Sequence, residues 1–470
     1  MGIFDFDRAI DSTFDTAFNL TAKLLGATFS GTFSVIRNAA TSFNEGRRIR
    51  RTAEASRDNR GVWVSSSVDK KALCLNDDPK FDDTETVRDA DNEPALDYLA
   101  GDSEFPESVI ISGGTDEDRC TALIPFIFKS QNKNMSIVIL HNSDSELEAM
   151  IAGNCKAYEI ISQDGLYCDI LAGLIPDDIV RLIYDTIGED KAKEGTESLL
   201  RALVNVVLTR NSKACVEDIA SFPLGSLRNE INRLKDSRLI KDYEHSEWTG
   251  DYDAGSKARD SVRSFLDRLN TDFKSVFGEA RPKRSNIRRT LNSKGIVMID
   301  IGKCSAEIAV QLIMNYLLLL DKNNHNFNVI IDDLPIAKFP EFGDLIRGRA
   351  YAISHSDFIA SLSLSRSKYN HENNSEELFI DLTCDAGAAV VFRHNGIVSC
   401  RKWSEYFGTY RKIKVQREHT RSGGLFSYHR SDALAEHEQD LPRVRERSIS
   451  MLPDGVACVY RSEGIFIGSI

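Results

Sequence analysis

The residues best placed to do chemistry lie between Ser108 and Pro125, where an apolar run is followed by two glycines and then by acidic residues. This order predicts a strand, a tight turn and the start of a helix, which is the layout of a phosphate-binding loop. Such a loop surrounds phosphates with backbone N–H groups, and a lysine neutralises the charge of the β- and γ-phosphates. We therefore expect Gly113, Gly114 and Thr115 to face a nucleotide.

The lysine that this chemistry requires is absent from the motif. Its position is held by Asp118 or Arg119, and Asp116 and Glu117 stand beside it. Three carboxylates at a helix N-terminus suit the helix dipole, but they would repel a triphosphate. Arg119 and Thr121 are the remaining candidates for phosphate contact, although a forked guanidinium does not by default fit a lysine slot. The sequence thus indicates a nucleotide-binding element that has lost its main cation.

A second motif, Val329 to Asp333, is an apolar strand that ends in two carboxylates. In this layout Asp332 would hold Mg²⁺ and Asp333 would orient the attacking water, which makes the pair the candidate catalytic residues. The alternative is a plain strand followed by a turn, in which aspartate serves only as a turn former. If the motif is functional, the turn at Gly113 and these aspartates lie side by side at the carboxyl ends of adjacent strands.

Composition describes an ordinary globular protein of 470 residues, with 41% hydrophobic and 28% charged residues. A net charge of −12 argues against a surface that coats nucleic acid broadly. A local basic patch, such as Arg281 to Arg284 with Arg288 and Arg289, could still face phosphates or could simply be a solvated face. The nine cysteines form no CxxC pair. They indicate reduced thiols in the cytoplasm, without a disulfide frame or zinc site.

The segment 1–60 is predicted to be helical and to carry a basic run from Arg47 to Arg60. Its most apolar part, Phe14 to Ile36, contains charged residues and is not a clean transmembrane span. Two interpretations remain open for this segment. It is either an interfacial helix held at an anionic membrane or a helical hairpin that docks on the body or on a partner.

Short β-branched runs alternate with helical stretches over the rest of the chain, which predicts a twisted, mostly parallel α/β sheet covered by helices. The runs begin at Val109, Ser136, Gly295, Asn328 and Ala388. We expect an acidic polar linker at 61–104, two parts of the sheet domain at 105–174 and 293–410, an all-α insertion at 175–292, and a flexible stretch with a C-terminal β element at 411–470.

Several local patterns along residues 105–470 resemble the type IV secretion coupling proteins of the TraG/TraD type, in the HerA/FtsK branch of RecA-fold motors. The patterns are Asp169-Ile-Leu-Ala-Gly173, Ile330–Asp333, Gly348-Arg349, Ala360-Ser-Leu-Ser-Leu364, Ser404-Glu-Tyr-Phe-Gly408 and Met451-Leu-Pro-Asp-Gly-Val-Ala-Cys-Val459. The resemblance implies a RecA-like P-loop NTPase core with an all-α insertion, ATP and Mg²⁺ as cofactors, and assembly into a ring.

Three departures from the family weaken the implied activity. The lysine of the loop is missing, Ala360 stands where the family has a sensing glutamine, and His141 stands where it tends to have an aspartate. Losing a charge that neutralises the transferred phosphoryl group costs about 3 kcal/mol or more of transition-state stabilisation. These departures predict that ATP and Mg²⁺ bind weakly or not at all, and they leave enzymatic activity uncertain.

Three hypotheses about function follow. The first is a degenerate coupling-type subunit of a DNA or protein translocation apparatus, in a ring with itself or with an active paralogue. It would lie in the cytoplasm or at the inner face of the cell membrane, with residues 1–60 contacting a membrane or a secretion partner. The second is an active DNA-translocating ATPase in which Arg119 and Thr121 contact phosphate and Asp332 and Asp333 manage Mg²⁺. The third is a scaffold in a phage-defence or assembly complex.

Overall fold

The computed structural model describes residues 62–70, 73, 87–90, 94–100, 106–302, 306–323, 325–336, 339, 341–363, 374–424 and 427–470. For 87–90, 100, 363, 374–377 and 410–441 only the backbone is described. The predicted helical segment 1–60, its Arg47–Arg60 run and most of the stretch 61–104 lie outside these residues.

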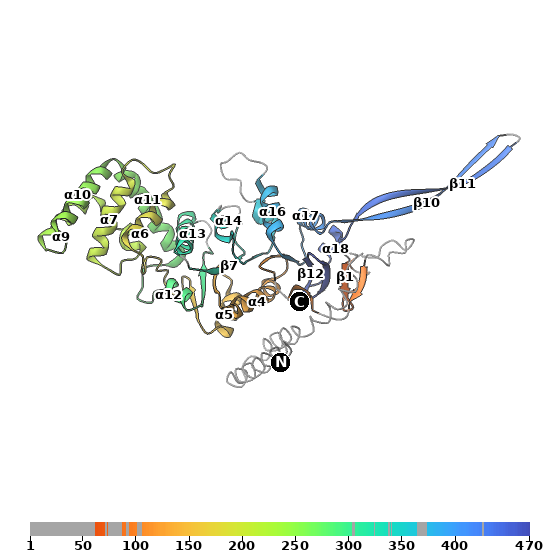
Figure 1. Ribbon diagram of the computed structural model, residues 1–470, viewed down its shortest axis with the longest axis horizontal. Coiled ribbons are helices and arrows are strands. Elements are labelled where there is room, and N and C mark those ends of the chain that lie inside the picture. The colour runs from red at the N-terminus through yellow and green to blue at the C-terminus, as the bar shows by residue number, and fades with distance from the viewer. Residues whose placement is uncertain are drawn as a thin grey trace, which may run out of the picture.

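The described residues form a central sheet of 11 strands in the order β2-β1-β13-β12-β9-β3-β8-β7-β4-β6-β5 (Figure 1). Neighbouring strands run parallel except at β12, which is antiparallel to both β13 and β9. The predicted fold class, a mostly parallel sheet covered by helices, is therefore confirmed. The strands are β1 Val62–Ser65, β2 Val87–Ala90, β3 Ser108–Ser112, β4 Ser136–His141, β5 Tyr158–Ile161, β6 Ile296–Asp300, β7 Phe327–Asp332, β8 Tyr351–His355, β9 Ala388–Val391, β12 Val456–Arg461 and β13 Gly464–Ser469.

The central strands are buried on both faces, as their β-branched runs predict. In β3, Val109 and Ile111 belong to one hydrophobic cluster and Ile110 to the other. Because successive side chains point to opposite faces of a sheet, this division means that helices cover both faces. The five runs noted in the sequence become β3, β4, β6, β7 and β9.

The expected adjacency of the glycine turn and the paired aspartates is wrong by one strand. β8 lies between β3, which leads into Gly113, and β7, which ends at Asp332. All three strands are parallel, so their carboxyl ends still share one edge of the sheet. β8 was not expected, because Tyr351–His355 contains alanine and serine rather than a β-branched run.

Helices α3, α4 and α5 supply one hydrophobic cluster, and α13 and α14 supply the other. Buried apolar residues recur in these helices every three or four positions, which places them on one face. In α4, for example, Leu123, Phe126 and Ile127 are buried. The helices of the sheet domain are α3 Ala95–Ala100, α4 Asp116–Asn132, α5 Ser145–Asn154, α13 Glu307–Lys322, α14 Glu341–Ile346, α15 Phe358–Ser363, α16 Asn374–Asp385, α17 Ile397–Phe407 and α18 Glu446–Ser450.

An all-α region interrupts the sheet between β5 and β6, as the sequence predicts. It forms one end of the elongated molecule (Figure 1). Helix α6 shows why these residues are helical: Pro176 takes the first position, and Ile179, Leu182 and Ile183 are buried along one face. The region comprises α6 Pro176–Ile187, α7 Thr196–Arg210, α8 Val216–Ala220, α9 Leu227–Asp236, α10 Asp242–Ala254, α11 Arg259–Phe277 and α12 Ile287–Asn292, with short 3-10 turns at Leu224–Ser226 and Gly255–Ala258.

Two segments take more regular structure than the sequence suggests. β1, inside the stretch expected to be a polar linker, pairs with β13 and buries Val62 and Val64. The stretch from 411 onward, expected to be flexible, contains a long antiparallel hairpin of β10 Thr409–Gly424 and β11 Ser427–Pro442. Its polar composition hides this pairing, because a strand without an apolar face gives no period-two signal.

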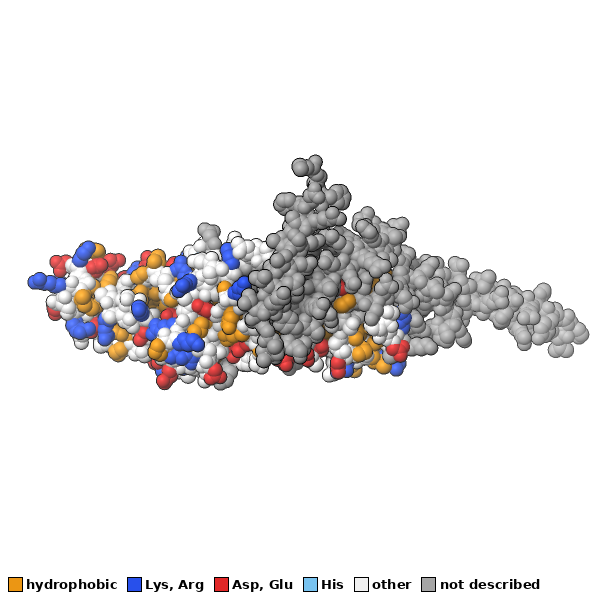
Figure 2. Space-filling view, turned by 90° about the horizontal axis from the view of Figure 1, so that it is seen from below, with side chains coloured by type: hydrophobic (Ala, Val, Ile, Leu, Met, Phe, Trp, Pro, Cys, Tyr) orange, Lys and Arg blue, Asp and Glu red, His pale blue; other side chains and the backbone are white. Residues whose placement is uncertain are grey.

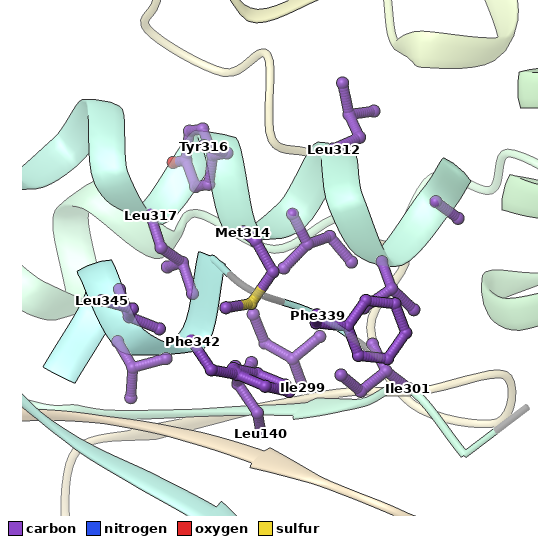
Figure 3. Close-up of a cluster of buried hydrophobic side chains, with 14 of the residues drawn as sticks. Leu140, Ile299, Ile301, Leu312, Met314, Tyr316, Leu317, Phe339, Phe342 and Leu345 are labelled. Atoms are coloured by element: carbon purple, nitrogen blue, oxygen red, sulfur yellow. The ribbon is translucent and has the colours of Figure 1, made fainter. Parts of the chain in front are cut away.

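The core under α13 supports the carboxylate strand. Figure 3 shows Met314 of α13 pointing toward Leu140 of β4 and Ile299 of β6, with Phe342 of α14 beside them. These four side chains are fully buried. They fill the space between the helices and β4, which is the neighbour of β7, and β6 beyond it, so the position of β7 depends on this packing.

We predict that Leu140→Ala lowers the free energy of unfolding by about 2–5 kcal/mol, because it leaves a cavity in this cluster. Urea unfolding followed by circular dichroism measures the change. Leu239→Ala is the control: Leu239 is 61% exposed, so the same truncation should cost no more than about 0.5 kcal/mol. Equal losses in the two variants would contradict this account of the core.

Candidate functional site

A row of polar residues crosses the carboxyl edge of the sheet at the ends of five neighbouring strands. The register places Ser112 of β3 opposite His355 of β8, and His141 of β4 opposite both Asp332 of β7 and Asp300 of β6. Ligands of open α/β sheets bind outside the carboxyl ends of strands, so this edge is the candidate site. Of the five residues, only Asp332 was singled out from the sequence as catalytic.

The glycine turn is short, and its amides are already used. It has three residues between Ser112, the end of β3, and Asp116, the start of α4. The Gly113 N–H donates to the His355 carbonyl (3.0 Å), and the Gly114 N–H donates to the Arg393 carbonyl (3.3 Å). A phosphate-binding loop needs these amides free and several residues between its glycines.

Both glycines are required by the chain that packs against them. Gly113 and Gly114 have φ of +85° and +71°, a region that favours glycine. A Cβ on Gly113 would lie 2.7 Å from the Arg393 carbonyl oxygen, and one on Gly114 would lie 2.9 Å from Cγ of Phe392. The glycines thus fit a close approach of residues 392–393, and no ligand is needed to explain them.

Thr115 closes the turn as a helix cap. Its hydroxyl accepts from the Asp118 N–H (3.2 Å), and its own N–H donates to the Asp118 carboxylate (2.9 Å). This reciprocal pair satisfies two donors at the start of α4. Thr121, the other hydroxyl proposed to contact phosphate, donates to the Glu117 carbonyl inside the helix (2.8 Å).

Arg119 points inward and not toward solvent. The residue is 3% exposed, donates to the Gly114 carbonyl (3.2 Å), and forms an ion pair with Asp116. Its positive charge also acts to lower the pKa of both Asp332 and Asp333. The guanidinium therefore binds the turn directly, and its positive charge also reaches the aspartates.

Asp332 is buried at the centre of the row. It is 1% exposed, and its Oδ2 has no hydrogen-bond partner among the described residues. Burial raises the pKa of Asp332 to about 7, and the nearby carboxylates Asp144 and Asp333 also act to raise it. At neutral pH this carboxyl is therefore partly protonated, which weakens it as a metal ligand.

Asp333 is held by the neighbouring strand end. Its φ is +50°, and its Oδ1 accepts from both the N–H (3.1 Å) and the hydroxyl (2.8 Å) of Ser356. Although burial acts to raise it, these hydrogen bonds and His355 hold the pKa of Asp333 below its usual value. An oxygen of the carboxylate that would orient a water is thus used to fix the β8 turn.

A buried network that the sequence did not indicate ties the end of β3 to α17. Ser112 Oγ accepts from the Trp403 indole (3.2 Å) and from the Phe358 N–H (3.3 Å), and lies 3.0 Å from His394 Nε2. Because the hydroxyl already accepts twice, its proton is available to the imidazole, which then accepts. Trp403 of α17 lies 291 positions from Ser112 in the sequence, so no local pattern reveals the contact.

On the other side of Asp332, Asp144 links three elements. It accepts from the N–H groups of Glu146 and Leu147 (2.9 Å each) at the start of α5, and from the Cys120 thiol (3.3 Å). Its own N–H donates to His141 Nδ1 (3.2 Å). Burial lowers the pKa of His141 and raises that of Cys120, so both groups are neutral near pH 7.

Ala360 does not lie at a strand end. It is the third residue of α15, whereas β8 ends at His355. The residue at the end of β8 is His355. Its Nδ1 accepts from the Asp357 N–H (2.9 Å), and burial lowers its pKa. A neutral imidazole engaged in this way cannot replace the two-ended hydrogen bonding of a glutamine amide.

The residues present do not fit ATP and Mg²⁺. The turn is short, three of its amides donate within the protein, and the nearest cation is paired with Asp116 and a carbonyl. Among the described residues no group of three or more His, Cys, Asp or Glu could hold a metal ion. The assignments of Gly113, Gly114, Thr115, Arg119 and Thr121 to nucleotide, and of Asp332 and Asp333 to Mg²⁺ and water, stay predictions.

The basic run near the end of the all-α region is largely structural. Arg281 donates to the carbonyl of Ser162 (2.6 Å), Arg284 to that of Lys213 (2.7 Å), and Arg288 to that of Gly173. Arg281 and Arg288 thus bind the segment between β5 and α6, whereas Arg284 binds the loop between α7 and α8. On the face shown in Figure 2, basic and acidic side chains are interspersed over the helical region, which offers no continuous basic stripe for nucleic acid.

No family model and no curated protein matches this chain. Solved structures that resemble it include the bacterial conjugative coupling protein TrwB in its unbound form, at 12% identity and a TM-score of 0.45, covering 77% of this chain and 85% of that one. TrwB in complex with ADP and Mg²⁺ gives 12% identity and a TM-score of 0.46, covering 77% and 84%. VirB4 of Thermoanaerobacter pseudethanolicus gives 9% identity and 0.41, covering 77% and 89%. At such identities and scores the likeness extends to no site, ligand or partner of this chain.

No helix among the residues that the structure describes has both the length and the apolar character to cross a bilayer.

We predict that Asp332→Asn raises the free energy of unfolding relative to the wild type in a pH-dependent way. The folded pKa of about 7 lies above the ordinary 3.8, so the wild type loses stability as pH rises from about 4 to 7 and then levels off. Asparagine cannot ionise, so its advantage should grow over that window, by at most about 1.4 kcal/mol per unit of pKa difference. Urea titrations at about pH 4, 6 and 8 measure it.

The control is Asp190→Asn at an exposed loop position, which should change stability by no more than about 0.5 kcal/mol at each pH. A gain for Asp332→Asn that is the same at all three pH values would show that the carboxyl is not the titrating group.

Proposed function

We propose that this chain is a RecA-like subunit without efficient ATP turnover, which works as a coupling-protein-like component of a DNA or protein translocation apparatus. Its sheet and helical region would present surfaces to partners, in a ring with itself or beside an active paralogue. The sequence patterns along residues 105–470 support the coupling role. The geometry at the carboxyl edge supports the loss of turnover.

The observation that carries the proposal is the internal cation at the glycine turn. In a working site, Mg²⁺ and a lysine balance the carboxylates and the phosphates. Here the buried guanidinium of Arg119 pairs with Asp116, and its charge acts against the rise in the pKa of Asp332 that burial causes and helps to keep the pKa of Asp333 low. The edge is therefore neutralised in part by the protein itself, without a nucleotide.

A second candidate is a weak Mg²⁺-nucleotide site, and one observation favours it. Asp332 Oδ2 is buried without a hydrogen-bond partner among the described residues. Buried acceptors of this kind are usually satisfied, and a bound ion is one way to satisfy this oxygen. Its raised pKa gives another explanation, because a bound proton also reduces the cost of burying this group. Direct binding measurements separate the two candidates.

We expect the purified full-length protein to show no saturable binding of ATP with Mg²⁺ below millimolar concentration and no hydrolysis with or without DNA, because the donors that hold phosphates are occupied. Isothermal titration calorimetry and a phosphate-release assay test this, with a lysine-bearing ATPase as the positive control. Arg119→Lys should not restore turnover, since Gly113 and Gly114 remain bonded to carbonyls. Micromolar binding that Asp332→Ala abolishes, with DNA-stimulated turnover, would favour the active-ATPase hypothesis.

We further expect Arg119→Met to lower the free energy of unfolding by about 1–3 kcal/mol, because it removes a buried charged donor and leaves its acceptors unpaired. The loss should grow as pH rises toward 8, since the aspartates then lack a nearby cation. Arg347→Met is a matched control: it breaks another Arg–Asp pair of the same helical spacing, with Asp344, in which the arginine side chain is 80% exposed. That change should cost no more than about 0.5 kcal/mol. Equal losses would contradict the role given to Arg119.

A further inference from the structure

The hairpin of β10 and β11 is a two-stranded sheet of its own that projects from the body of the protein. Each strand has 16 residues, which corresponds to a ribbon of roughly 50 Å. Figure 1 shows it extending away from α17 and α18, at the end opposite the all-α region. No other strand of the described residues pairs with β10 or β11, so both edges of the ribbon are open there.

A ribbon of this kind needs something beside it. An isolated two-stranded hairpin is marginally stable in water, and an open edge presents unpaired N–H and C=O groups to any other strand. Natural proteins usually keep such edges short or break them with proline or a bulge. In this hairpin the register runs without a break from Thr409–Pro442 to Gly424–Ser427. Its edges are therefore long, regular and suited to pairing.

Charge is divided between the two strands. β10 contains five lysines and arginines and one glutamate, whereas β11 contains one arginine and four aspartates and glutamates. One edge of the ribbon thus belongs to a basic strand, and the other edge belongs to an acidic strand. Two copies of the ribbon can bring unlike edges together, and like edges would repel.

The register inside the hairpin leaves most of these charges without an opposite charge directly across. Arg411 faces Asp440, but Lys412 faces Gln439 and Arg417 faces Leu434. On the acidic strand, Glu436 and Glu438 face Val415 and Ile413. Basic residues gather on β10 and acidic residues on β11, yet most of them do not face an opposite charge within the hairpin. This arrangement favours a partner outside the hairpin that supplies the opposite charges.

We propose that the β10 edge of one copy of this chain pairs with the β11 edge of a second copy, so that the hairpins join the subunits of an assembly. The inference names the contact of the homo-oligomer suggested under the proposed function and rests on that assembly, but it requires nothing of the nucleotide site. Main-chain hydrogen bonds provide the affinity, and the unlike charges of the two edges set the order of the strands.

The contact is head-to-tail, because it joins two different edges. Such a contact generates a ring when its repeated rotation closes on itself, and the proposed assembly is of this closed kind. Each outgoing β10 then lies beside a returning β11, which is an antiparallel pairing like the one inside the hairpin. A closed ring would leave no open edge, which resolves the hazard of the free ribbon.

A nucleic acid is a poorer occupant for this ribbon. The basic residues of β10 would attract phosphate, but β11 lies alongside them over the whole length and has four acidic residues. Phosphate contacts would be opposed by those carboxylates, whereas a second copy matches both strands at once.

Charge reversal tests the contact on the full-length protein. A basic-to-acidic variant carries Lys412→Glu, Lys414→Glu and Arg417→Glu, and an acidic-to-basic variant carries Asp432→Lys, Glu436→Lys and Glu438→Lys. All six positions face an uncharged residue in the register, counting histidine as neutral, so neither variant breaks an opposite-charge pair directly across the hairpin. Sedimentation velocity over a range of protein and salt concentrations measures assembly.

We expect the wild type to form oligomers that weaken as salt rises, because screening reduces attraction between exposed charges. Each variant alone has two edges of like sign. Its dissociation constant for assembly should rise by roughly tenfold or more, which is a loss of about 1.4 kcal/mol of binding free energy per contact. An equimolar mixture of the two variants should regain wild-type assembly, because unlike edges meet again. This recovery also shows that neither variant has merely unfolded.

The control variant reverses three exposed charges on the all-α region, Lys191→Glu, Lys193→Glu and Arg268→Glu, and should assemble as the wild type does. A wild type that stays monomeric, variants that assemble unchanged, or a mixture that fails to recover would each overturn the proposal. Loss of DNA binding in the basic-to-acidic variant with assembly intact would overturn it in favour of a nucleic acid. Calorimetry with ATP on the same samples reports the nucleotide site separately.

Discussion

The carboxyl edge of the sheet depends on one buried cation. Asp332 and Asp333 lie close together, Asp144 is near enough to raise the pKa of Asp332, and Asp116 begins α4 beside the turn. Like charges grouped at a partly buried edge are costly unless a positive charge or a bound proton compensates them. Arg119 provides the positive charge, and the raised pKa of Asp332 provides the proton. Both come from the chain itself.

The glycine turn follows from the same constraint. Arg119 can reach the Gly114 carbonyl only because the turn is tight and α4 begins three residues after β3. The same tight loop also places the Gly113 N–H at the His355 carbonyl and the Gly114 N–H at the Arg393 carbonyl. The absence of a lysine is therefore one of several features of this turn: its amides and its buried cation make contacts within the protein, and the turn itself is short.

Local sequence signals predicted the elements of the fold better than the contacts of the site. β-branched runs identified β3, β4, β6, β7 and β9, and helical spacing identified the all-α region, because burial imposes those patterns on neighbouring residues. β8 was not predicted, because its alanine and serine interrupt the run of β-branched residues that indicates a buried strand. The Ser112, His394 and Trp403 network joins distant parts of the chain, so only the folded structure brings it together.

The stability of the sheet and the chemistry at its carboxyl edge depend on different residues. The strands are held by two apolar clusters and by parallel pairing, and neither cluster includes a residue of the glycine turn. The stability of the sheet is thus separable from phosphate binding, and substitutions at the turn can weaken phosphate binding without unfolding the sheet. At this edge the charge of Arg119 reduces the electrostatic penalty of burying Asp332, whose pKa burial raises. A ligand that took up the guanidinium of Arg119 would first have to displace its ion pair with Asp116.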